Sequence, residues 1–91
     1  MIRLVEVMET STGFLLEEVW INETHVIRIR SASAYKKLLK EGHLPPNLDK
    51  NHDFTSVVVA MGELREEHIV VGDVGTIASK LDYDTRTLLK G

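Results

Sequence analysis

The residues that could carry chemistry are spread along the chain without the spacing that catalysis or metal binding requires. The chain has no cysteine, and no serine lies in a Gly-x-Ser-x-Gly motif. Its four histidines lack the spacing of His-Glu-x-x-His, which brings two metal ligands to one helix face. The adjacent pairs Glu17-Glu18 and Glu66-Glu67 would point to opposite faces of a strand. We therefore expect no catalytic residues, no metal site and no cofactor.

A glycine-containing turn at residues 72–76 lies between an expected strand and an expected helix, where phosphate-binding loops are found. It contains neither Gly-x-Gly-x-x-Gly nor Gly-Lys-Ser/Thr, and Asp73 would place a negative charge where an anion should bind. Asp73 is better explained as the residue that caps the following helix.

The side chains best suited to binding are aromatic and basic residues in the first half of the chain. Trp20 is the single tryptophan, and its flanking residues Val19 and Ile21 favour a core role, although tryptophan is also a preferred interface residue. Arginine and aromatic side chains together could stack on an anionic ligand and donate hydrogen bonds to it. The candidate binding residues are Trp20, Arg28, Arg30, Tyr35, Lys36, Lys37 and Lys40.

The composition is typical of a small globular protein. With 91 residues, 43% of them hydrophobic, the chain is expected to form a single domain over residues 1–91 with little spare apolar area. Its 14 acidic and 11 basic residues give a net charge of −3, which provides no overall attraction to nucleic acid or to anionic membranes. The lack of cysteine and of an apolar run of ~18 residues favours a cytoplasmic location.

Alternating apolar residues predict antiparallel strands joined by turns. The strands are expected at residues 2–8, 14–21, 25–30, 55–61 and 68–71. A continuous apolar run at residues 57–60 predicts a central strand that is covered on both faces. Residues 62–67 are expected to form a charged connection, and residues 43–53 an exposed loop around Pro45 and Pro46.

Two helices are expected beside the sheet. The first helix is expected to begin at Ser31 or Ser33 and to end at Gly42. The second is expected to begin at Asp73 or Thr76. The last residues, with Leu88 and Leu89, are expected to prolong the second helix or to pack as an arm on this chain or a partner chain. The fold class is therefore α+β: an antiparallel β-meander of about five strands with one inserted helix and one C-terminal helix.

The order of these features resembles the FlbD/SwrD family of short flagellar and swarming-motility proteins. The resemblance lies in Met1-Ile2-x-Leu4, Gly13-Phe14-x-Leu16, Ile21-Asn22 with Val26, Ile27 and Ile29, Thr55-x-Val57 through Gly62, and Ile69-Val70-Val71 leading to Ile77 and Leu81. It implies a β-meander that is closed by a short helix. Residues 31–54 replace a short turn of the family, so we expect the function particular to this chain in that segment. The same strand pattern is also similar to LytTR-type DNA-binding domains.

Three functions remain open. The favoured one is a small non-enzymatic regulatory protein that binds another protein, or a second copy of itself, through residues 31–54. The second is capture of a small anionic, nucleotide-like ligand by Arg28, Arg30 and the helix lysines, as a phage-encoded inhibitor or sponge would do. The third is LytTR-like nucleic-acid binding through Lys36, Lys37, Lys40 and Lys50, which the acidic composition disfavours.

Overall fold

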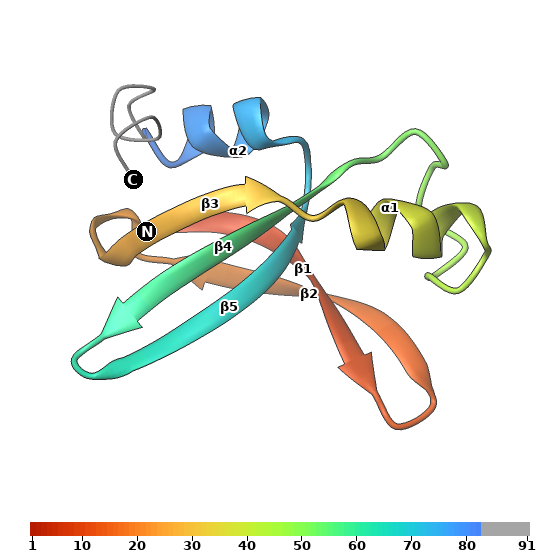
Figure 1. The fold of residues 1–91 in the computed structure, drawn as a ribbon, viewed down its shortest axis with the longest axis horizontal. Coiled ribbons are helices and arrows are strands. Elements are labelled where there is room, and N and C mark those ends of the chain that lie inside the picture. The colour runs from red at the N-terminus through yellow and green to blue at the C-terminus, as the bar shows by residue number, and fades with distance from the viewer. Residues whose placement is uncertain (83–91) are drawn as a thin grey trace.

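The computed structural model describes residues 1–82, which form five antiparallel strands and two α-helices (Figure 1). The strands are β1 (Ile2–Thr10), β2 (Gly13–Ile21), β3 (Val26–Ser31), β4 (Phe54–Met61) and β5 (Leu64–Val71). The short 3₁₀-helix η1 (Glu23–His25) precedes β3, α1 (Ser33–Lys40) follows it, and α2 (Val74–Lys80) follows β5. The sheet order is β2-β1-β5-β4-β3, so the expected α+β fold with one inserted helix and one helix after the last strand is confirmed. Leu88 and Leu89 lie outside the described residues.

Strand β4 is the second strand from one edge and is buried on both faces, as its apolar run predicts. Every residue from Phe54 to Val59 is buried. Thr55 is fully buried among them, and its hydroxyl donates a hydrogen bond of 2.8 Å to the carbonyl oxygen of Gly72. This bond ties β4 to the turn that leads into α2, so the one polar side chain fully enclosed in β4 has a partner.

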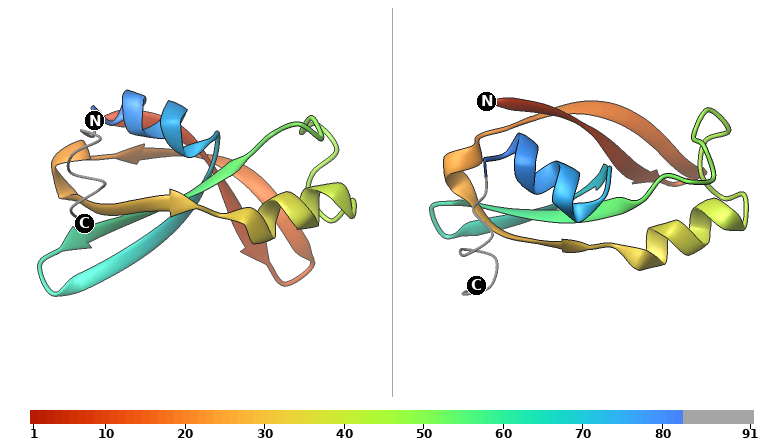
Figure 2. Two further views of the ribbon diagram at one scale, coloured as in Figure 1. Left: turned by 45° about the horizontal axis from the view of Figure 1, so that its top comes forward. Right: turned by 90° about the horizontal axis from the view of Figure 1, so that it is seen from above.

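The hairpin β1–β2 crosses the hairpin β4–β5 instead of lying flat beside it (Figure 1). Within the described residues the ladder between β1 and β5 consists of one residue pair, Glu6 with Val70, and the two hairpins diverge away from that point (Figures 1 and 2). Leu4 and Val7 lie on opposite faces of β1, and β1 therefore buries Leu4 in one apolar cluster and Val7 in another. Apolar residues on both faces of β1 were expected, and the two clusters explain them.

The first cluster lies between the hairpin β1–β2, the strands β3 and β4, and α2 (Figure 2). Ile77 of α2 is fully buried in it. Asp73 occupies the N-cap position of α2, as expected, but its side chain makes no capping hydrogen bond. Gly72 precedes it with a φ of 133°, and a Cβ at Gly72 would lie 2.9 Å from Cδ1 of Ile77. A glycine is therefore needed where the chain turns back to lay α2 on the sheet.

The second cluster packs α1 and the loop after it against the opposite face of the sheet. Phe54 is 2% exposed in this cluster, and its ring centroid lies 6.3 Å from that of Tyr35 on α1. The expectation that residues 43–53 form an exposed loop was wrong for Leu44, which is buried in the cluster. Leu48 of the same loop also packs against this cluster, so two apolar side chains hold the loop on the sheet.

The expected charged connection at residues 62–67 is largely a strand. β5 begins at Leu64, which pairs with Met61, and only Gly62 and Glu63 form the turn. Gly62 has a φ of 63°, the conformation that a two-residue hairpin turn requires of its first residue. The charged residues that follow extend the ladder because their side chains lie at an end of the sheet where they can reach water.

The expected serine cap of α1 was also wrong, whereas the expected stop at Gly42 is confirmed. The N-cap residue is Ala32, which makes no side-chain capping hydrogen bond. Its backbone N–H still belongs to the sheet, because it donates a hydrogen bond of 2.9 Å to the carbonyl oxygen of Phe54. At the other end, the Gly42 N–H donates to the Leu39 carbonyl oxygen and the His43 N–H to the carbonyl oxygen of residue 38. This is a Schellman motif, in which glycine takes the positive φ, here 79°.

Candidate binding groove

The divergence of the two hairpins leaves a groove at the end of the molecule that carries η1, on the left in Figure 1. Its volume is about 410 Å³. One wall comes from the end of β2 and from η1, and the other from β4 and β5. We call it the hairpin groove. Its lining residues are Met1, Val19, Trp20, Ile21, Asn22, His25, Val59, Met61, Glu66 and His68.

The hairpin groove has a buried aliphatic floor and an exposed, larger rim. Ile21 and Val59 belong to the first apolar cluster and are buried. Met1, Trp20 and Met61 are 69%, 56% and 50% exposed. Adaptable methionine side chains and a rigid aromatic ring around an apolar floor are typical of surfaces that bind other proteins.

Trp20 is not the core residue that its apolar neighbours predict. In the β1–β2 ladder it lies opposite Arg3, while Val19 and Ile21 point to the other face of the strand and pack against the first cluster. β2 is also one of the two edge strands of the sheet. The ring therefore has no strand beside it on one side, and more than half of its surface is exposed.

The polar end of the groove is formed by His68 and two carboxylates. Nδ1 of His68 lies 2.6 Å from Oε2 of Glu6, and Nε2 lies 3.5 Å from Oε2 of Glu66. The side chains of His68 and Glu6 are only 17% and 14% exposed, and they connect β5 to β1 at the point where the hairpins cross. This contact therefore joins the two hairpins beside the groove.

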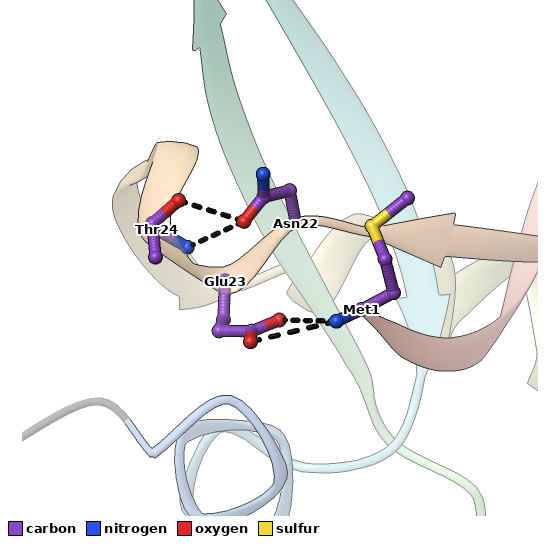
Figure 3. Close-up of polar contacts among 4 residues, drawn as sticks. All are labelled: Met1, Asn22, Glu23 and Thr24. Carbon is purple, nitrogen blue, oxygen red and sulfur yellow. Dashed lines mark hydrogen bonds and ion pairs between the residues drawn. The ribbon is translucent and has the colours of Figure 1, made fainter.

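Local hydrogen bonds around η1 hold the other wall (Figure 3). Oδ1 of Asn22 accepts hydrogen bonds from the N–H of Thr24 at 3.1 Å and from its hydroxyl at 2.7 Å. The amino group of Met1 lies 3.0 Å from Oε2 of Glu23. A hydrogen bond from its own backbone, followed by that from the amino terminus, lowers the pKa of Glu23. His25, expected on a strand, lies in η1 and faces the groove from this wall.

The other arginine and aromatic candidates line separate hollows. Arg28 lines a hollow of about 650 Å³ together with Arg65, Glu66 and Glu67, so two guanidinium groups are accompanied by two carboxylates. Arg30 and Tyr35 line a third hollow of about 370 Å³. The seven candidates therefore do not gather where Trp20 lies.

The three lysine candidates have two different environments. Nζ of Lys36 lies 2.8 Å from Oδ1 of Asp53 and donates a hydrogen bond of 3.2 Å to the Asn51 carbonyl oxygen, so this side chain fastens the loop to α1. Lys37 and Lys40 are exposed in the last turn of α1, where their charge suits the helix C-terminus.

Trp20 is the one candidate that lines the groove, so its other lining residues, and Glu6 beside them, were missed as site residues from the sequence. The spacing of Glu66 and His68 is the one available signal, because residues two apart on a strand share a face. Nothing local connects Glu6 with His68, since they are 62 positions apart and meet only through the crossing of the hairpins.

No family model, curated protein or solved structure matches the chain. The resemblance to the FlbD/SwrD family therefore stays a prediction. Within residues 1–82, no three histidine, aspartate or glutamate side chains are grouped to hold a metal ion. None of the helices in this range is long and apolar enough to cross a membrane.

Proposed function

We propose that the protein is a non-enzymatic binding protein that docks a segment of a partner protein in the hairpin groove. One observation carries this proposal: the single tryptophan is 56% exposed on the edge strand that forms one wall of a groove with a buried aliphatic floor. Covering an exposed aromatic ring removes apolar surface from water, and tryptophan is the residue type most enriched among residues that dominate binding energy. The groove volume of about 410 Å³ suits a few inserted side chains.

The alternatives draw less support from the geometry. An anionic ligand would need several cationic groups around one hollow, and the hollow beside Arg28 holds as many carboxylates as guanidinium groups. A recognition role for residues 31–54 would rest on Lys37 and Lys40, because the apolar side chains of this segment pack in the second cluster. A cytoplasmic location is part of our proposal, since the chain has no cysteine to be oxidised.

A selection of short peptides from a random displayed library tests the proposal. Selected peptides should bind Trp20→Ala at least roughly tenfold more weakly than the parent chain, because loss of a dominant interface residue has effects of this size or larger. Leu15→Ala is the matched control, since Leu15 lies on the same strand, is 37% exposed and does not line the groove.

Thermal unfolding should show that both variants are folded at the binding temperature. Peptides that bind Trp20→Ala as tightly as the parent chain would contradict docking in the hairpin groove. Equal weakening by Leu15→Ala would contradict it as well, because the effect would then not be specific to the groove.

A further inference from the structure

We propose that the segment docked in the hairpin groove carries an apolar anchor residue next to a lysine or arginine. This inference rests on the proposed function and specifies the chemistry of the partner. The inference follows from the charged side chains at the polar end of the groove. The apolar floor explains the anchor residue but not the basic residue beside it.

Three carboxylates share the face of the sheet on which the groove opens. Glu6 lies directly opposite Glu17 in the β1–β2 ladder, so both side chains point to the same face. Val19 and Ile21 follow Glu17 at two-residue steps and therefore share this face as well. The aliphatic floor thus continues along β2 to the carboxylate of Glu17, about 7 Å beyond Val19. Glu66 lines the groove from β5.

The carboxylates at this end outnumber the cationic groups that line the groove, although Glu66 also borders the hollow that holds Arg28 and Arg65. With His68 neutral, the three carboxylates carry a charge of −3, and an imidazolium between Glu6 and Glu66 leaves −2. In the described part of the chain no lysine or arginine lines the groove. The other titratable groups that line it are His25 and the amino group of Met1, and the latter already pairs with Glu23.

A basic side chain beside the anchor would complete this site. Glu66 is 54% exposed and Glu17 is exposed, so either can bind a cation while part of its hydration remains, and the desolvation penalty stays small. An apolar residue that packs on Ile21 and Val59 beside Met61 leaves its neighbours one or two positions away within reach of these carboxylates. The net charge of −3 also favours encounter with a basic segment.

The test is the displayed-library selection carried out in parallel on the parent chain and on Glu17→Lys/Glu66→Lys. The matched control is Glu9→Lys/Glu41→Lys, which makes the same change of net charge at two exposed positions that do not line the groove. The parent and the control should select apolar residues within two positions of lysine or arginine. The groove variant should select aspartate or glutamate beside the same apolar anchors and should bind the parent's peptides at least roughly fivefold more weakly.

Failure of this inference is distinguishable from failure of the proposed function. The basic residue beside the anchor would be contradicted, and docking in the groove would stand, if the peptides selected by the parent chain were not enriched in lysine or arginine but still depended on Trp20 for binding. Peptides that bind regardless of Trp20 would overturn both. A wild-type dimer that Trp20→Ala dissociates would show instead that the occupant is a second copy of the chain. Tighter peptide binding by Leu88→Ser/Leu89→Ser would show that the occupant is the chain's own C-terminal segment, and would also overturn the inference.

Discussion

The contact between His68 and Glu6 connects the two hairpins where they cross, so weakening it should destabilise the fold and the groove together. The two atoms Nδ1 and Oε2 are 2.6 Å apart, and both side chains are less than one-fifth exposed. A hydrogen bond to a charged group contributes about 1.5–3 kcal/mol and a neutral one about 0.5–1.5 kcal/mol. Glu6→Gln keeps the size and an acceptor but removes the charge. We therefore expect the free energy of unfolding to fall by about 1–1.5 kcal/mol.

For a domain of this size, that loss corresponds to a decrease in Tm of roughly 4–12 °C. Thermal and urea unfolding at neutral pH measure it. Glu17→Gln is the matched control, because Glu17 lies directly opposite Glu6, is exposed and forms no ion pair within residues 1–82. It should change the stability by no more than about 0.5 kcal/mol.

A double-mutant cycle that adds His68→Asn isolates the pair itself. We expect a coupling free energy of about 1 kcal/mol between the two positions. The reasoning would be refuted if Glu6→Gln lowered Tm no more than Glu17→Gln, or if the substitutions at Glu6 and His68 were additive within about 0.5 kcal/mol.

Two further substitutions test the packing that positions the groove. Thr55→Val removes the hydroxyl that donates to the partly buried carbonyl oxygen of Gly72, so the urea midpoint should fall by an amount equivalent to about 0.5–1.5 kcal/mol; an unchanged midpoint would contradict this role. Burial, followed by the charges of Glu9 and Glu67, raises the pKa of Tyr35 above the ordinary 10.0, so the folded state keeps the phenolic proton longer than the unfolded chain. Stability should therefore decrease as pH rises above 10.0, and Tyr35→Phe should reduce that decrease; identical alkaline unfolding profiles would speak against it.

Local signals were sufficient to predict most elements of the fold. The apolar run in β4 predicts a strand that is covered on both faces, and Gly42 predicts the end of α1, because burial and positive φ each depend on a few adjacent residues. The start of β5 could not be predicted in this way. The charged composition of its first residues is typical of a loop. These residues form a strand because Leu64 pairs with Met61 across a two-residue turn.

The candidate site was less predictable because it depends on contacts between distant segments. Residues 28–40 are close to Trp20 in sequence, but Arg28 and Arg30 line other hollows and Lys36 fastens a loop. The hairpin groove exists because two hairpins cross where Glu6 pairs with Val70. Strand alternation shows which residues share a face, but it does not reveal the crossing of two hairpins.

The fluorescence of Trp20 tests the central claim most directly, because the chain has only this tryptophan and it stands at the rim of the groove. The measurement is the emission spectrum and the acrylamide quenching of the full chain during titration with a tryptophan-free peptide selected for binding. Docking in the hairpin groove predicts a shift of the emission maximum to shorter wavelength and a loss of quenching, both saturating with the binding isotherm. An emission spectrum and a quenching constant that stay unchanged at saturating peptide would show that the partner binds elsewhere.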